Sequence, residues 1–274
     1  MSIKDVKVIK DFCQLCDDGW LQGWHERNGG NLTYRLTDAE VEELRPYFDE
    51  TPRPWVNMGV TGANLAGTYF LSTGSGKYFR NAMTRTEDTI CICEINDKGD
   101  SYRIVWGLVN GGKPTSEFPS HFMNHSVRYD VTGGSDRVIY HAHPANTIAL
   151  TFIVPLNDRD MTRVLWKSMT ECPVVFPRGI AVVPWMVPGG ADIAMASCVK
   201  MKEYDAVVWA HHGLFVSGPD FDTAFGLMHT VEKSAEIFIR FKSTGMEQLQ
   251  TITDDDLRAV ANEFNAPLRE EFLD

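Results

Sequence analysis

The stretch "VIYHAHPAN", residues 138–146, places His141 and His143 one residue apart at the end of an apolar run. In a β-strand, residues i and i+2 point to the same face about 7 Å apart, so both imidazoles can converge on one ion while Ala142 points away. A single histidine is more often a hydrogen-bonded core residue. Two histidines at this spacing favour a pair of metal ligands, and a third ligand must then come from elsewhere.

A second apolar run, "YDAVVWAHHG", also ends in histidines and offers that third ligand. Catalytic zinc commonly takes three protein ligands and keeps one position open for water or substrate. His211 and His212 would face opposite sides of a strand, so only one of them could reach the ion, and the spacing does not decide which. The remaining histidines lack paired spacing and are expected to be structural: His25, His121, His125 and His229.

Two glycine-rich turns could hold an anionic substrate. They are "RNGGN" (27–31) and "TGSGK" (73–77). Turns of this kind expose backbone N–H groups that can surround phosphate oxygens, and Asn28, Asn31 and Ser75 would add side-chain donors. Neither turn is a Walker loop or a GxGxxG motif. Each one, taken alone, is more often a plain turn.

The segment "PTSEF" (114–118) is a third candidate for anion binding. Thr115 and Ser116 could cap a following helix, whose N-terminus would attract negative charge. Glu117 would then lie in the first helical turn, which is also an ordinary place for a carboxylate.

Hydrophobic periodicity predicts the elements that must position these residues. Strands are expected at 32–36 and in "TYFLSTGSG", "TICICEIN", "SYRIVWGLV", "RVIYHAH", "CPVVFP", "GIAVVPWMVPG" and "YDAVVWAHHG". Helices are expected in "TSEFPSHFMNHSVRY" and at residues 3–24, 38–48, 146–154, 158–169, 190–204, 220–244 and 253–264, with an irregular stretch at 51–68. Strands joined by hairpins and strands separated by helices together predict a mixed sheet in one α/β domain, residues 1–274.

Composition excludes several classes of partner. Lys and Arg number 26 against 37 Asp and Glu, a formal charge of −11, and no basic cluster is present, so a nucleic-acid partner is not expected. No apolar run approaches the roughly 18 residues of a membrane helix, and residues 1–10 lack a signal-peptide pattern. We therefore expect a soluble, cytoplasmic protein that does not bind membranes. Its six cysteines are dispersed, and we expect them to be reduced core residues.

The order of the motifs resembles the class II aldolase/adducin family. The matching segments, from about Trp20 to Gly245, are "RNGGNLT", "STGSGKYFRN", "PTSEFPSHF", "HAHPANTIALT", "TECPVVFP", "PWMVPG" and "HHGLFVSG". "TEC" and "FPRGIAVVPWMVPG" are similar to the members that act on rhamnulose phosphate. The resemblance implies a three-layer αβα sandwich with a mixed, mostly antiparallel central sheet, a zinc-dependent lyase and a cyclic homotetramer.

The resemblance also implies roles for individual residues. It makes His212 rather than His211 the third metal ligand. Glu117 would be the general base toward dihydroxyacetone phosphate, and Glu171 would assist proton transfer at the aldehyde half from across a subunit interface. One Zn²⁺ per subunit would be bound by His141, His143 and His212. The substrate contacts would be Asn28, Asn31, Ser75, Gly76, Thr115 and Ser116.

The implied activity is reversible cleavage of L-rhamnulose 1-phosphate to dihydroxyacetone phosphate and L-lactaldehyde. A related metal-dependent sugar-phosphate aldolase is an alternative, and so is a phosphopentose 4-epimerase of the same family, which would use the same zinc and the same retro-aldol step. A non-catalytic, adducin-like interaction module would leave no reason for three histidines and Glu117 to occur together. Carbonic-anhydrase-like hydration would leave Glu117 and the glycine-rich turns without a role, and the absence of HExxH argues against a zincin protease.

Overall fold

The computed structural model describes residues 2–274, whose strands form one nine-stranded sheet in the order β2-β5-β4-β3-β1-β6-β9-β8-β7. Only β7 and β8 pair in parallel, and every other neighbouring pair in this part of the chain is antiparallel. The strands are β1 (Asn31–Arg35), β2 (Val56–Asn57), β3 (Tyr69–Thr73), β4 (Ile90–Ile95), β5 (Ser101–Gly107), β6 (Val138–Ala142), β7 (Ala181–Val183), β8 (Ala206–Trp209) and β9 (Gly213–Gly218). The predicted mixed, mostly antiparallel sheet is confirmed.

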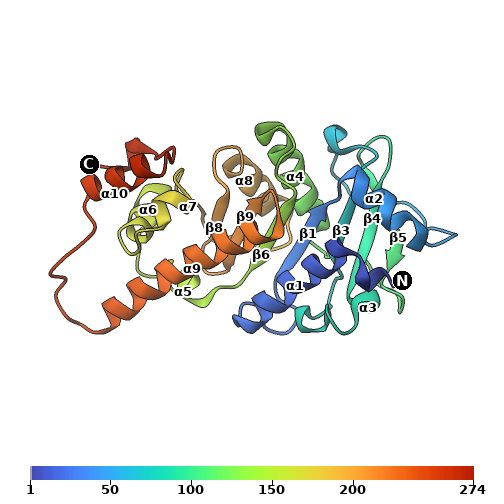
Figure 1. The fold of residues 1–274 in the computed structure, drawn as a ribbon, viewed down its shortest axis with the longest axis horizontal. Coiled ribbons are helices and arrows are strands. Elements are labelled where there is room, and N and C mark those ends of the chain that lie inside the picture. The colour runs from blue at the N-terminus through green and yellow to red at the C-terminus, as the bar shows by residue number, and fades with distance from the viewer. Residues whose placement is uncertain (1) are drawn as a thin grey trace.

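Helices cover both faces of this sheet (Figure 1). They are α1 (Lys7–Leu21), α2 (Asp38–Leu44), α3 (Thr86–Thr89), α4 (Phe118–Thr132), α5 (Ala145–Leu150), α6 (Asp158–Trp166), α7 (Cys172–Val175), α8 (Ala191–Lys200), α9 (Phe221–Ser243) and α10 (Asp254–Glu263). The long helix α9 packs beside α1 and against β6 and β9, while α4 and α8 pack together and against β1, β6 and β7. No helix within residues 2–274 is both long and apolar enough to cross a membrane.

Alternation along β1 shows that the two helical layers lie on opposite faces. The Tyr34 ring packs against Phe221 of α9, with ring centroids 4.6 Å apart. The next side chain back along the strand, Thr33, hydrogen-bonds to His121 and His125 of α4. Successive strand residues point to opposite faces, so the three-layer αβα arrangement follows.

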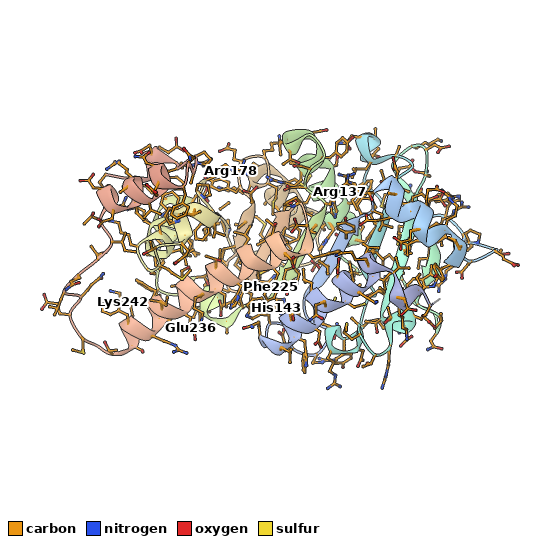
Figure 2. All side chains as sticks on the ribbon, in the orientation of Figure 1. Arg137, His143, Arg178, Phe225, Glu236 and Lys242 are labelled. Atoms are coloured by element: carbon orange, nitrogen blue, oxygen red, sulfur yellow. The ribbon has the colours of Figure 1, made fainter. Side chains whose placement is uncertain are left out.

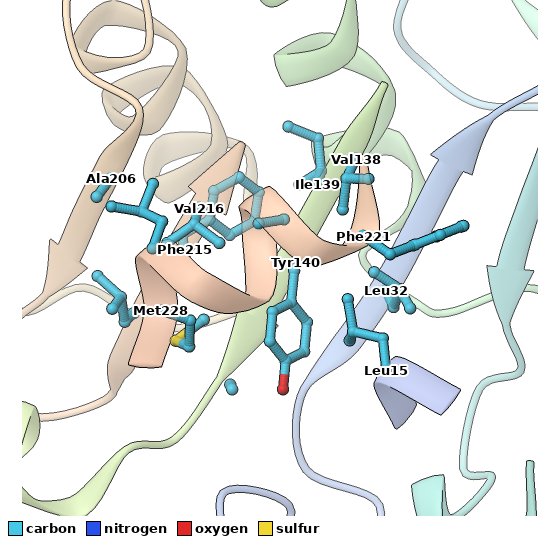
Figure 3. Close-up of a cluster of buried hydrophobic side chains, with 14 of the residues drawn as sticks. Leu15, Leu32, Val138, Ile139, Tyr140, Ala206, Phe215, Val216, Phe221 and Met228 are labelled. Carbon is cyan, nitrogen blue, oxygen red and sulfur yellow. The ribbon is translucent and has the colours of Figure 1, made fainter. Parts of the chain in front are cut away.

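The layer between the sheet and α1 and α9 is a hydrophobic core (Figure 3). Leu32 of β1 lies opposite Tyr140 of β6, and both are fully buried together with Leu15 of α1 and Met228 of α9. Burying one such side chain contributes roughly 1.5–3 kcal/mol. All six cysteines are buried and unpaired, as expected.

Several predicted elements differ from the structure: β9 was not predicted, and β2 lies in the stretch expected to be irregular. "CPVVFP" was expected as a strand, but it forms the short helix α7, with Pro173 in its first turn. Proline has no N–H to donate to a sheet and is well tolerated at a helix start, which favours the helix. The expected helix over 3–24 is interrupted at Val6, whose backbone is extended, and α1 begins only at Lys7.

Candidate metal and substrate site

Four strand ends meet at one edge of the sheet. β1 is antiparallel to β3 and β6, so its first residues lie beside the last residues of both. β9 is antiparallel to β6, so its first residues also lie beside the end of β6. Asn31 pairs directly with His141 across β1 and β6, so their side chains share the face that α4 covers. This edge brings together residues far apart in sequence.

Three of the predicted ligands form a compact cluster at this edge. One ligand atom from each of His141, His143 and His212 lies within 4.8 Å of the others. The Nδ1 atom of His141 donates to the Leu214 carbonyl at 3.0 Å, which leaves Nε2 as the atom with a lone pair. Figure 2 shows His143 at the lower edge of the sheet in that view.

The donor set fits a zinc ion. Within residues 2–274, His141 Nε2 and His212 Nδ1 are buried and have no hydrogen-bond partner. Leaving a buried polar atom without a partner costs about 1–3 kcal/mol, and neutral imidazole nitrogens are preferred zinc ligands. Burial lowers the pKa of His141 well below its ordinary value and that of His212 to about 4, and neighbouring His143 acts in the same direction. Both rings are therefore neutral at physiological pH and can donate lone pairs.

The third ring of the cluster is oriented by a carboxylate. His143 Nδ1 donates to Glu26 Oε1 at 2.7 Å, so its Nε2 is the atom left for a metal. An acceptor of this kind fixes the ring orientation and raises the basicity of the ligand. A Cβ atom on Gly29 would lie 2.8 Å from Glu26 Oε1 and 3.0 Å from His143 Cε1, so a larger residue there would displace Glu26 from the His143 ring. The sequence reasoning missed Glu26, and its adjacency to this turn was the available signal.

The turn after β8 explains which of the two adjacent histidines joins the cluster. The expectation that His211 and His212 alternate along a strand is wrong, because β8 ends at Trp209 and His211 has φ 61°. The His211 ring turns outward, hydrogen-bonds to Thr151 Oγ1 at 3.0 Å and lies outside the cluster. A Cβ on Gly213 would collide with the Ala142 carbonyl oxygen, so glycine lets His212 approach β6.

Glu117 lies beside the histidine cluster. It occupies the N-cap position of α4 rather than the first turn, and its side chain makes no capping hydrogen bond. Instead, Asn31 Nδ2 donates to Glu117 Oε2 at 3.1 Å. Burial raises the pKa of Glu117, while the Asn31 hydrogen bond and His143 lower it. Glu117 is thus hydrogen-bonded to β1, the strand that pairs with β6 at His141.

The two other predicted substrate segments lie side by side. Thr115 N donates to the Thr73 carbonyl at 2.7 Å, and Ser75 N donates to the Lys113 carbonyl at 2.9 Å. Thr115 is buried, and its hydroxyl accepts a hydrogen bond from Glu117 N at 3.3 Å. Thr115 is therefore not the N-cap of α4, a position that Glu117 occupies. The residues left accessible at these turns include Ser75, Gly76 and Ser116.

Three residues have a different setting. Asn28 is exposed in the 27–31 turn, next to the cluster through Gly29. Lys77 forms an ion pair with Asp88 at 2.7 Å, which partly neutralises its charge. Glu171 is exposed at the N-cap position of α7, a helix that packs against α6, α9 and α10 rather than beside the histidines. Within one subunit, the structure does not bring Glu171 to the cluster.

A family model described as Class II Aldolase and Adducin N-terminal domain matches residues 10–239. The chain belongs to the class II aldolase and adducin family. The resemblance inferred from the sequence is therefore confirmed, and the nine-stranded sheet with its helical layers is the fold of that family.

The chain is similar over most of its length to proteins whose activity is named. The chain is 47% identical to a rhamnulose-1-phosphate aldolase from Mannheimia succiniciproducens, over 90% of each chain. It is 42% identical to a rhamnulose-1-phosphate aldolase from Klebsiella pneumoniae, covering 100% of this chain and 98% of that one. A solved sugar-phosphate aldolase from Thermotoga maritima is 27% identical, with a TM-score of 0.73 over 88% of this chain and 97% of that chain.

Proposed function

We propose that this protein is a metal-dependent aldehyde-lyase that reversibly cleaves L-rhamnulose 1-phosphate to dihydroxyacetone phosphate and L-lactaldehyde. The observation that carries the proposal is the hydrogen bond from Asn31, the strand partner of His141, to the partly buried carboxylate of Glu117. It joins a candidate proton-transfer group to a three-histidine cluster. The rhamnulose-1-phosphate aldolases similar over most of the chain support this choice of substrate.

The metal ligands in this proposal are His141, His143 and His212, holding one Zn²⁺ per subunit. When bound, zinc supplies positive charge that stabilises the negative charge developing on the substrate's oxygen atoms. Glu117 removes a proton from dihydroxyacetone phosphate in the direction of synthesis and returns it in the direction of cleavage. Burial raises the pKa of this carboxyl group toward neutrality, which suits a general base.

The phosphate group is assigned to the two adjacent turns. The Gly76 backbone N–H and the Ser75 hydroxyl offer donors, and the N-terminus of the 15-residue helix α4 offers a favourable dipole. Ser75, Gly76, Thr115 and Ser116 line this region in the proposal, and Asn28 and Asn31 contact substrate oxygens from the 27–31 turn. Because Lys77 is paired with Asp88, neutral hydrogen-bond donors rather than Lys77 bind the phosphate group in this proposal.

A homotetramer completes the site in this proposal, with Glu171 acting across a subunit interface. The exposure of Glu171 on a single subunit is compatible with a role toward a neighbouring subunit. Mixed oligomers of Glu171→Ala and His143→Ala subunits test it, because some sites then receive both intact residues. Mixing should restore cleavage that neither variant has alone; activity no higher than the sum of the two variants would refute the shared site.

The deciding experiment measures cleavage of L-rhamnulose 1-phosphate by reducing the released dihydroxyacetone phosphate. It is repeated after metal removal with a chelator and again after zinc is restored. Loss and recovery of activity would establish substrate and metal together. Full zinc loading without cleavage would reject this substrate and direct the same assay to phosphopentoses, the substrates of an epimerase.

We further propose that residues 1–274 act as one domain in cytoplasmic rhamnose degradation, with a small sugar phosphate as the partner and neither nucleic acid nor membrane involved. The acidic formal charge of −11 supports the exclusion of nucleic acid.

A further inference from the structure

A continuous chain of buried hydrogen bonds runs from the interior of α4 to the carboxylate of Glu117. Thr33 Oγ1 lies 2.8 Å from His125 Nε2 and 2.8 Å from His121 Nδ1. His121 Nε2 contacts Asn31 Oδ1, and Asn31 Nδ2 donates to Glu117 Oε2 at 3.1 Å. Asn31 and Thr33 project from the same face of β1. The four residues whose hydrogen bonds lead to Glu117 are at most 6% exposed: His125, Thr33, His121 and Asn31.

The chemistry of these groups fixes the direction of every donor. The Asn31 amide nitrogen faces the carboxylate, so its oxygen faces His121 and must accept from Nε2–H. Burial lowers the pKa of His121 to about 3, so the ring is neutral and its Nδ1 has a lone pair that accepts from the Thr33 hydroxyl. The Thr33 oxygen then accepts from His125 Nε2–H. All donors point toward Glu117.

We propose that Thr33 and His121 are positioning residues for proton transfer: they hold the Asn31 amide with its NH₂ group on Glu117 Oε2, so that Oε1 is the oxygen that takes and returns the proton. This inference rests on the function proposed for Glu117. An amide NH₂ group cannot accept a hydrogen bond, so a proton on Oε2 would find no acceptor in Asn31, and the carboxylate oxygen is the better acceptor; both effects favour Oε1 as the oxygen that is protonated.

The network matters because the two ends of an asparagine side chain have nearly the same shape. Without the N–H of His121, the Asn31 amide can rotate by 180° and place its oxygen against Glu117. That oxygen would repel the carboxylate and would accept a hydrogen bond from the protonated acid, which would trap the proton on Oε2. A hydrogen bond to a charged group contributes about 1.5–3 kcal/mol, or roughly 10- to 100-fold in rate.

The test compares Thr33→Val, which removes the hydroxyl while keeping the shape, with Thr33→Ser, which keeps the hydroxyl. The readout is deuterium exchange into dihydroxyacetone phosphate by the zinc-loaded protein. Thr33→Val should lower kcat for exchange about tenfold with KM unchanged, His121→Phe should lower it by up to about 100-fold, and Thr33→Ser should stay within about twofold of the parent protein. Equal rates for Thr33→Val and Thr33→Ser would overturn the inference.

Thr162→Val is the matched control, because Thr162 is also a buried threonine whose hydroxyl bonds to the Ile180 backbone, away from the site. It should leave exchange unchanged; a loss as large as that of Thr33→Val would mean that any buried hydroxyl has this effect and would overturn the inference. Failure of the parent protein to catalyse exchange would instead refute the proposed function, and the positioning role with it.

Neutron diffraction from deuterated crystals of the unaltered protein gives an answer that does not depend on how a variant folds. Deuterium on His121 Nε2 and on the Asn31 nitrogen facing Glu117 is the expected result. Deuterium on His121 Nδ1, or an Asn31 oxygen facing the carboxylate, would overturn the inference even in an active enzyme.

Discussion

Two groups of histidines lie on the same side of the sheet and differ in how their ring nitrogens are hydrogen-bonded. One group is the cluster of His141, His143 and His212, and the other is the buried pair His121 and His125. His141 and His121 are equally buried, at 1% and 0% exposure, and burial lowers the pKa of both. Among residues 2–274, neither His141 Nε2 nor His212 Nδ1 has a hydrogen-bond partner. Both nitrogens of His121 have partners, in Thr33 and Asn31. Burial therefore does not distinguish a proposed metal ligand from a structural histidine, whereas the hydrogen bonding of the second ring nitrogen does.

The largest effect is expected from His143→Ala, which removes one of the three proposed metal ligands. Bound zinc and cleavage should disappear together, as shown by metal analysis of the purified protein and the coupled assay. His211→Ala is the control, since this adjacent histidine is exposed and lies outside the cluster. Stoichiometric zinc in His143→Ala would remove that residue from the ligand set.

Glu117→Gln should come next, because Glu117 stands between the two groups of histidines. The variant should keep its zinc and slow deuterium exchange by roughly 10² to 10⁴, the usual contribution of a general base. Exchange measured by NMR on dihydroxyacetone phosphate checks this. An unchanged exchange rate would assign the proton transfer to another group.

Glu26→Ala should weaken metal binding without abolishing it. Loss of the acceptor that orients the His143 ring should reduce zinc affinity about 10- to 100-fold. Competition with a chromophoric chelator measures the affinity, and Glu43→Ala, an exposed glutamate on α2, is the matched control. Equal affinities for the two variants would mean that the ring needs no external orientation.

The smallest effect concerns a histidine whose nitrogens are both satisfied. His25 hydrogen-bonds to the Gly29 carbonyl at 2.9 Å and to the Tyr140 hydroxyl at 2.7 Å, and burial lowers its pKa from 6.5 to about 3. Below pH 6.5 the unfolded chain binds a proton that the native chain does not. The stability present above pH 6.5 therefore falls as the pH drops toward 3, by about 1.4 kcal/mol per pH unit.

Replacing His25 removes this contribution. The free energy of unfolding of the metal-free proteins is measured with urea at several pH values. Between pH 6.5 and 5 it should fall by about 2 kcal/mol less in His25→Gln than in the parent protein. Identical slopes would show that His25 is protonated in the native state and would weaken the distinction between the two kinds of histidine.

The sequence predicted the parts of the site that depend on local spacing. The period-two pattern of β6 placed His141 and His143 together, and apolar runs located most strands and helices. Short apolar runs are ambiguous between strand and helix, which is why "CPVVFP" was assigned wrongly. The contacts of Glu26 with His143 and of Thr33 with His121 join residues about a hundred positions apart, so no local pattern reveals them.

The pairing of β1 with β6 has a consequence for how this protein can change over evolutionary time. Asn31 and Thr33 face α4 only because Asn31 sits opposite His141, and a one-residue slip would turn both side chains to the other face. An insertion or deletion within β1 would thus abolish chemistry even where the protein still folds. The exposed segment between α9 and α10 can lengthen without disturbing this pairing, so sequence length in descendants of this protein should vary there and stay constant in the five residues of β1.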